Sequence, residues 1–127
     1  MSFEKLKGTR ILIVDDEQLL RETIEMHLEL EGVIVSHASD GKEAFDLITK
    51  NKYNVVLSDI RMPGCSGIKL LEMVRASSLK TPPIVLMSAF TDISEDKAKE
   101  LGARGMFLKP TDMSYLKELL VESLENF

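Results

Sequence analysis

Five short apolar segments recur along the chain and constrain its fold more than any other feature. Each has three or four residues, mainly Val, Ile, Leu or Met: Ile11 to Val14, Val33 to Val35, Val55 to Leu57, Ile84 to Met87 and Met106 to Leu108. Continuous apolar runs are typical of parallel strands that are covered on both faces, whereas half-exposed strands alternate polar and apolar residues. Only the run at 33–35 has flanking residues that allow an edge position.

Segments with the period of an amphipathic helix lie between these apolar runs. The inward face of the first consists of Leu20, Ile24, His27 and Leu28, and Gly32 is expected to end that helix. Side chains of Asp and Ser accept hydrogen bonds from the first turn of a helix, and the expected caps of the next four helices are Asp40, Ser66, Asp92 and Asp112. A strand followed by a helix, repeated five times, predicts a parallel α/β sheet with right-handed crossovers and helices on both faces.

Length and composition limit the classes of protein that fit. A chain of 127 residues predicts a single domain. The net charge of −5 disfavours a nucleic-acid-binding surface, and no apolar run approaches the length of a membrane span. Cys65 is the single cysteine, so a free thiol in a reducing compartment is expected. With an N-terminus that has no apolar signal core, we expect a cytoplasmic protein with neither nucleic-acid nor membrane partners.

Charged and polar residues follow four of the predicted strands. Asp15, Asp16 and Glu17 follow the first strand and Asp59 follows the third, while Ser88 and Lys109 follow the fourth and fifth. Ligands of open α/β sheets bind outside the carboxyl ends of the strands. If these strands lie near one another, the acids, the hydroxyl and the lysine converge on one rim of the sheet.

The convergence of acids predicts a metal site with phosphoryl chemistry. Mg²⁺ prefers oxygen ligands, and the expected direct ligands are Asp16 and Asp59, with Asp15 acting through water. An aspartate is also a covalent nucleophile that forms an aspartyl phosphate, whose oxygens Mg²⁺, Lys109 and the Ser88 hydroxyl could hold. Glu17 falls at a helix start, where a carboxylate favours the helix dipole, so its expected role is structural.

The motifs VDDE, SDIRMPG, SAF and LKP, in this order and spacing, resemble a response-regulator receiver domain, of which the chemotaxis single-domain regulator is the best-known member. The resemblance covers roughly residues 9–126. It implies a doubly wound, flavodoxin-like fold, with a five-stranded parallel sheet in the order 2-1-3-4-5 and five helices. The whole chain, 1–127, would then be a single receiver domain.

The resemblance also implies a role for each site residue. Asp59 would be the phosphoacceptor, Ser88 the switch hydroxyl and Lys109 the phosphate-binding lysine. Mg²⁺, or Mn²⁺ in its place, would be held by Asp16, Asp59 and the backbone carbonyl of Arg61, with Asp15 assisting through water.

Its partners and output follow from the same resemblance. The phosphodonor would be a phosphohistidine of a sensor histidine kinase or phosphotransfer protein. The output would pass through the face around the fourth helix, fifth strand and fifth helix. It would reach a downstream effector or an output domain linked in a longer chain. Such a domain phosphorylates itself and loses the group by limited autodephosphorylation, and it is not a turnover enzyme.

Three departures from the family pattern affect the switch. Met106 occupies the position where receivers usually carry Tyr or Phe, and strand alternation predicts that Phe107 points to the opposite face. The segment from Ser88 to Lys109 is about one residue shorter than usual, in a fourth helix poor in apolar residues. The positions that commonly tune phosphoryl lifetime hold Arg61 and Phe90.

Other interpretations compete with this one. A Mg²⁺-dependent phosphatase with an aspartyl phosphate usually needs a second acid at the position of Arg61 and a cap domain, while a pseudo-receiver would lack part of the acid set. No glycine-rich phosphate-binding motif follows any strand. Structural roles are expected for His27 and His37. A second apolar line on the first helix, Leu19, Met26 and Leu30, is either scattered surface or a docking site for the phosphodonor.

Overall fold

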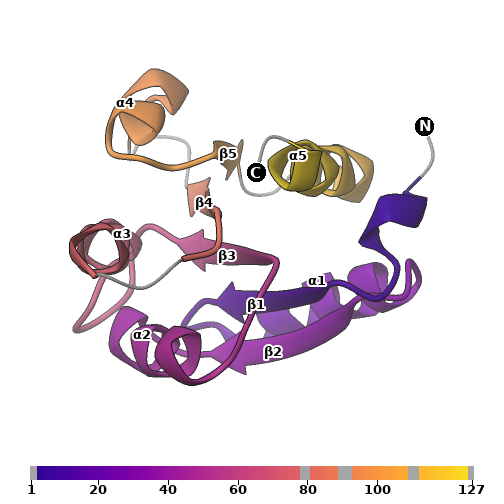
Figure 1. Ribbon diagram of the computed structural model, residues 1–127, viewed down its shortest axis with the longest axis horizontal. Coiled ribbons are helices and arrows are strands. Elements are labelled where there is room, and N and C mark those ends of the chain that lie inside the picture. The colour runs from indigo at the N-terminus through magenta and orange to yellow at the C-terminus, as the bar shows by residue number, and fades with distance from the viewer. Residues whose placement is uncertain (1–2, 78–80, 89–92, 109–111, 126–127) are drawn as a thin grey trace.

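The computed structural model describes residues 3–77, 81–88, 93–108 and 112–125. Its centre is a five-stranded parallel sheet in the order β2-β1-β3-β4-β5 (Figure 1). The strands are β1 (Arg10–Val14), β2 (Ile34–Ala38), β3 (Val55–Asp59), β4 (Ile84–Ser88) and β5 (Gly105–Leu108). The fold class, the strand order and the edge position of β2 are therefore confirmed.

A helix follows each strand within the described residues. The helices are α1 (Gln18–Glu29), α2 (Gly41–Lys50), α3 (Gly67–Ala76), α4 (Glu95–Glu100) and α5 (Met113–Glu125), and a 3₁₀ turn, η1 (Glu4–Leu6), precedes β1. None of these helices is both long and apolar enough to cross a membrane.

The sheet separates two apolar clusters, because successive side chains of a strand point to opposite faces. On one face Leu12, Val56 and Leu86 pack with residues of α2, α3 and α4, such as Leu70. On the other, Ile13 and its neighbours pack with residues of η1, α1 and α5. Figure 1 shows α2, α3 and α4 along one side of the sheet and α5 on the other. β1, β3 and β4 are covered on both faces and have continuous apolar segments, whereas the edge strand β2 is partly exposed.

Two expected helix caps are confirmed directly. The Asp40 side chain accepts a hydrogen bond from the Glu43 N–H at 2.9 Å, and Ser66 accepts one from the Lys69 N–H at 3.1 Å. At the start of α5 the Asp112 carboxylate accepts from the Ser114 N–H at 2.9 Å, which is the bond expected of a cap.

Several element ends differ from the prediction, most clearly those of the fourth helix and of β2. The fourth helix begins at Glu95 and is capped by Ser94, whose side chain accepts from the Lys97 N–H at 3.1 Å. The expected cap at Asp92 is therefore wrong, and Asp92 itself lies outside the described residues. β2 continues beyond the apolar run at 33–35 as far as Ala38, since its backbone stays paired with β1 up to the pair Val14 and Ala38.

Candidate functional site

Three carboxylates meet at the carboxyl ends of β1 and β3, the two central strands that lie side by side. Asp15 and Asp16 follow Val14 directly, and Asp59 is the last residue of β3. The register pairs Val14 with Ser58, so Asp15 and Asp59 follow at the same level of the sheet. Oxygens of all three carboxylates lie within 4.8 Å of one another. The predicted convergence of these acids is thus present in the structure.

The three acids differ in their exposure. Asp15 is fully buried and Asp59 is 6% exposed, whereas Asp16 is exposed. A buried carboxylate needs hydrogen bonds or a counter-charge to offset its lost hydration. The Asp15 Oδ1 accepts from the Glu17 N–H at 2.8 Å, and the Asp15 N–H donates to the Ala38 carbonyl at 3.1 Å. Asp15 therefore shapes the turn that leads from β1 into α1.

Glu17 is the residue that precedes the first turn of α1, and its side chain makes no capping hydrogen bond. Its backbone carbonyl accepts from the Arg21 N–H at 3.1 Å, in the ordinary pattern of a helix start. The expected position of Glu17 at a helix start is confirmed.

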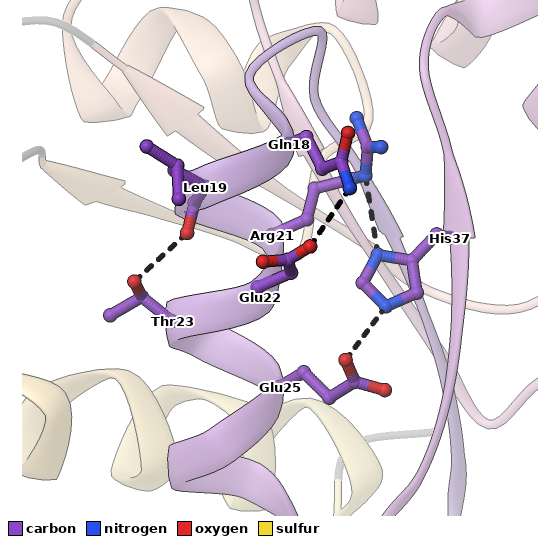
Figure 2. Close-up of polar contacts among 7 residues, drawn as sticks. All are labelled: Gln18, Leu19, Arg21, Glu22, Thr23, Glu25 and His37. Carbon is purple, nitrogen blue, oxygen red and sulfur yellow. Dashed lines mark hydrogen bonds and ion pairs between the residues drawn. The ribbon is translucent and has the colours of Figure 1, made fainter.

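Arg21 of α1 contacts the backbone of the acidic turn, and the sequence did not indicate this contact. Its Nη1 donates to the backbone carbonyl of Asp15, and its Nε donates to His37 Nδ1 at 3.2 Å. His37 Nε2 in turn lies 3.1 Å from Glu25 Oε1 (Figure 2). The available signal was weak: an arginine one turn into the helix that follows the acids. The expected structural role of His37 agrees with these contacts.

Asp59 is held by a close approach of α3. A Cβ built on Gly67 would lie 2.1 Å from the Asp59 carbonyl oxygen, which leaves no room for a side chain. The Gly67 N–H also donates to the Ile60 carbonyl at 2.9 Å, and the Ile60 N–H donates to Met87 of β4 at 2.9 Å. The backbone around Asp59 is thus fixed from both β4 and α3.

Ser88 ends β4 at the same rim of the sheet and is fully buried. Its strand pairs with β5, where Met106 packs into the cluster with α2, α3 and α4, and Phe107 packs into the opposite one. Both side chains are buried. The predicted opposite orientation of Met106 and Phe107 is confirmed, and a flexible thioether fills the position where receivers usually carry a ring.

Three other predicted site residues have different outcomes. Lys109 and Phe90 lie outside the described residues. Arg61 is exposed in the loop after β3, where it lines an open hollow of about 420 Å³ with Ile60, Met62, Pro63, Ser66 and Ile68.

The same loop carries Cys65, whose thiol pKa is raised by burial and then by the charge of Asp40. Cys65 is a free thiol.

The donor set fits a hard divalent cation. One oxygen of each carboxylate lies within 4.8 Å of the others, and oxygens at opposite corners of an octahedron around Mg²⁺ are about 4.2 Å apart, so these carboxylates are close enough to surround one cation. In the described part of the chain, no other group of three His, Cys, Asp or Glu side chains comes this close together. A cation would also offset the repulsion among the three carboxylates.

A family model of the response regulator receiver domain matches residues 11–121, which is most of the chain. The chain belongs to the response regulator receiver family. This receiver domain is a phosphorylation-dependent signalling switch, and its acidic cluster is consistent with the metal site of such domains. Receiver domains act with histidine kinases and effectors, and they are generally phospho-accepting signalling domains rather than turnover enzymes.

Individual relatives agree with this assignment. The receiver domain is 30% identical to sporulation initiation phosphotransferase F of Bacillus subtilis, over 94% of this chain and 96% of that protein. It is 36% identical to the osmosensing histidine protein kinase SLN1 of Saccharomyces cerevisiae, over 91% of this chain but 10% of the kinase. The receiver domain of the Francisella response regulator 1452 superposes with a TM-score of 0.85 at 28% identity, over 94% of this chain and 98% of that one.

Proposed function

We propose that Asp59 is the phosphoacceptor of this receiver domain and that Mg²⁺ is its metal ion. The observation that carries the proposal is the convergence of Asp15, Asp16 and Asp59 within 4.8 Å at the ends of two adjacent central strands. Asp16, Asp59 and the Arg61 carbonyl would hold the ion, and Asp15 would act through water. Mn²⁺ has the same preference for oxygen ligands and would substitute.

The proposed reaction is a phosphoryl transfer from phosphohistidine. A carboxylate oxygen of Asp59 attacks phosphorus in line with the leaving nitrogen, so an O–P bond forms while the N–P bond breaks. The imidazole leaves with the electron pair and takes up a proton. When bound, Mg²⁺ supplies charge stabilisation to the transferring group. Lys109 would hold a phosphoryl oxygen as a counter-charge, and the Ser88 hydroxyl would donate to another.

Mass spectrometry after treatment with acetyl phosphate and Mg²⁺ tests this proposal. The wild type is expected to gain the mass of one phosphoryl group, and Asp59→Asn is expected to gain none. Asp46→Asn is a matched control, because Asp46 is an exposed acid on α2, away from the strand ends. Loss of phosphorylation in the control, or its persistence in Asp59→Asn, would contradict the assignment.

The proposed output is a change of the face formed by α4, β5 and α5. Ser88 would move toward the phosphoryl group, and Met106 would adapt within its buried site, since a thioether side chain fills irregular gaps. Because Met106 has no ring or phenolic hydroxyl, the surfaces of the two states should differ less than in receivers with an aromatic switch. Structures with and without a phosphate mimic test this, and a large reorientation of an aromatic side chain at α4 would contradict it.

Arg61 and Phe90 are proposed to set the lifetime of the aspartyl phosphate. The Arg61 guanidinium would contact a phosphoryl oxygen, while the Phe90 ring would restrict attacking water and slow autodephosphorylation. Phe90→Ala is therefore expected to shorten the phosphoryl lifetime, measured after removal of acetyl phosphate. An unchanged rate would remove Phe90 from the proposal.

A histidine kinase or phosphotransfer protein is proposed to dock on α1. Leu19 and Met26 of α1 and Leu30 directly after it are 79%, 66% and 78% exposed, which is unusual for large apolar side chains that lie close together. In Figure 2 Leu19 and Thr23 lie on the side of α1 turned away from His37. This surface adjoins the acidic turn at the start of α1.

The remaining partners are proposed by class. A downstream effector would bind the α4-β5-α5 face, unless the output domain is linked in a longer chain. Residues 1–127 are proposed to form one receiver domain of the chemotaxis-regulator type, and the match to sporulation initiation phosphotransferase F over 94% of this chain and 96% of that protein supports this proposal. A cytoplasmic location is proposed, which suits the free thiol of Cys65.

A Mg²⁺-dependent phosphatase is the second candidate, because it would use the same acids. The position that such an enzyme needs for a general acid holds Arg61, a permanent cation. Assays with small phosphoesters separate the two candidates, and repeated turnover would favour the phosphatase.

A further inference from the structure

One arginine connects the acidic turn to two neighbouring elements. We propose that Arg21 is a positioning residue: it holds the Asp15 backbone carbonyl so that the carboxylates of Asp15 and Asp16 stay directed at the cation position beside Asp59. The inference rests on the proposed metal site. It concerns a residue that itself offers no ligand atom to a cation.

Three hydrogen bonds hold the acidic turn at Asp15. The Asp15 N–H donates to Ala38, and the Asp15 side chain accepts from the Glu17 N–H, so the backbone before and after the carbonyl is already held. The Arg21 Nη1 donates to the carbonyl between these two contacts. That carbonyl belongs to the peptide plane joining Asp15 to Asp16, and the plane's orientation determines where the Asp16 side chain begins.

Asp16 depends on this backbone more than the other two acids do. It is the exposed member of the cluster, while Asp15 and Asp59 are buried. A side chain without close packing is positioned chiefly by its own backbone. Rotation of the 15–16 peptide plane would therefore displace the Asp16 carboxylate first.

His37 and Glu25 brace the guanidinium. Arg21 Nε donates to His37 Nδ1 at 3.2 Å, and the other ring nitrogen, Nε2, lies 3.1 Å from Glu25 Oε1. Figure 2 shows Arg21 and Glu25 extending from α1 toward His37 on β2. A planar fork that donates from two nitrogens has one orientation, and a lysine ammonium cannot reproduce it. The end of β1, the helix α1 and the edge strand β2 are thereby locked together at the acidic turn.

The charge of Arg21 acts in the opposite direction to its positioning role. A cation near the acids repels Mg²⁺, so loss of the charge alone would strengthen Mg²⁺ binding. Loss of positioning would weaken it. The sign of the change in Mg²⁺ affinity therefore separates the two effects.

Isothermal titration of the unphosphorylated, full-length protein with MgCl₂ at constant ionic strength tests the inference. Arg21→Ala is expected to bind Mg²⁺ about tenfold more weakly, as for other residues that orient metal ligands. Arg21→Lys keeps the charge but loses the Nε donor, and it is also expected to bind more weakly than the wild type. The inference is overturned if Arg21→Ala binds Mg²⁺ at least as tightly as the wild type and Arg21→Lys binds it with the affinity of the wild type.

Arg75→Ala is the matched control. Arg75 Nη1 also donates to a backbone carbonyl, that of Leu101, at 2.8 Å, but it joins α3 to the end of α4. Urea unfolding in EDTA is expected to show a loss of stability for both arginine variants. Mg²⁺ affinity should change only for the Arg21 variant, and an equal change in Arg75→Ala would overturn the positioning role.

Two His37 variants add a readout that does not follow stability. In His37→Asn the amide oxygen takes the place of Nδ1 and accepts from Arg21, whereas His37→Ala has no acceptor. His37→Asn is expected to retain Mg²⁺ affinity and His37→Ala to lose part of it, although Asn is disfavoured in a strand. Equal affinities of the two variants would contradict the brace. If the wild type itself binds no Mg²⁺, the proposed metal site is wrong. If the wild type binds Mg²⁺ and the Arg21 variants bind it equally well, only the positioning role of Arg21 is refuted.

Discussion

The Asp59 carboxylate has opposite consequences for the stability of the fold and for the proposed chemistry. It is 6% exposed and lies beside two other carboxylates, and like charges at this distance repel one another. The same arrangement makes its carboxylate a cation ligand and a nucleophile. A substitution that removes the charge should therefore have effects of opposite sign with and without Mg²⁺.

We expect Asp59→Asn to be more stable than the wild type in EDTA, by on the order of 1 kcal/mol, since one of three adjacent negative charges is removed. In Mg²⁺ this difference in the free energy of unfolding should become smaller or change sign, because the wild type gains about 2.7 kcal/mol at a ligand concentration of 100 times Kd. Urea unfolding under both conditions measures these differences. Asp46→Asn, an exposed site, should respond to Mg²⁺ as the wild type does, and a wild type that is more stable than Asp59→Asn in EDTA would contradict the repulsion.

Individual residues also mark where sequence reasoning was sufficient. Asp15, Asp16 and Asp59 were predictable because each follows a continuous apolar run, and parallel strands bring such ends to one edge. The contacts of Arg21 were not, because they depend on the directions in which individual side chains of α1 and β2 point, and the hydrophobic pattern does not determine these directions. No periodicity encodes that an arginine on a helix reaches a carbonyl behind it.

Short elements were predicted less accurately than long ones. The expected cap of the fourth helix was Asp92, whereas Ser94 accepts the hydrogen bond that begins α4. Both residues are good caps by type, and six residues of helix give too little periodicity to decide between them. Glu95 and Asp96 in the first turn and Lys97 and Lys99 in the last favour the observed limits through the helix dipole.

The cap of α4 has a measurable contribution. Ser94→Ala should lower the free energy of unfolding by about 1 kcal/mol, because the Lys97 N–H loses its acceptor. Ser94→Asp, which keeps a capping oxygen, should lose little or none. Urea unfolding gives the global effect, and hydrogen exchange of the α4 amides gives the local one. Equal losses in both variants would show that the hydroxyl does not act as a cap.

The junction of β3 and α3 has no room for a side chain at Gly67. A Cβ there would lie 2.1 Å from the Asp59 carbonyl oxygen and 3.0 Å from its carbonyl carbon, and backbone atoms cannot rotate away. Gly64 in the same loop differs, because its φ is +83° and no atom lies within 4 Å of its Cβ position. The two glycines are therefore required for different reasons.

Gly67→Ala should destabilise the domain by about 3 kcal/mol, at the upper end of the cost of overpacking. Gly64→Ala should cost about 1–2 kcal/mol, the strain of a left-handed backbone. Gly67→Ala should also slow phosphorylation by acetyl phosphate, since the displaced atoms belong to Asp59. Urea unfolding and phosphorylation rates measure both effects. A Gly64→Ala variant that slows phosphorylation as much would contradict this distinction.

At the scale of the whole molecule, the two faces of the sheet are closed by different means. The cluster under α2, α3 and α4 lies beside the loops that surround Asp59, and it includes Met106. The cluster under α1 and α5 is completed by η1, and it is edged by an ion pair. Lys117 of α5 is one of few buried charged residues, with its Nζ 2.7 Å from Glu31 Oε2 and 5.6 Å from the centre of the Phe3 ring.

This ion pair connects α5 to the turn after α1 and to the segment before β1. The Glu31 side chain is 26% exposed and the Lys117 side chain 10%, so water screens the pair in part. Removal of the ammonium leaves Glu31 partly desolvated without its partner. The cost should be less than the 3–5 kcal/mol typical of a fully buried pair, and we expect about 2 kcal/mol for Lys117→Met, which keeps the apolar stem against Phe3.

A double-mutant cycle distinguishes the pair from the packing of the stem. Glu31→Gln with Lys117→Met leaves no unpaired charge, so the double variant should recover part of the loss seen in Lys117→Met alone. Thermal and urea unfolding of the four proteins measure the coupling. The exposed pair of Lys5 with Glu125, at 2.6 Å, is the control and should contribute about 1 kcal/mol or less. If the two pairs show equal coupling, burial does not strengthen the Lys117 contact. The attachment of α5 then rests on apolar contacts such as those of Leu116 and Leu120.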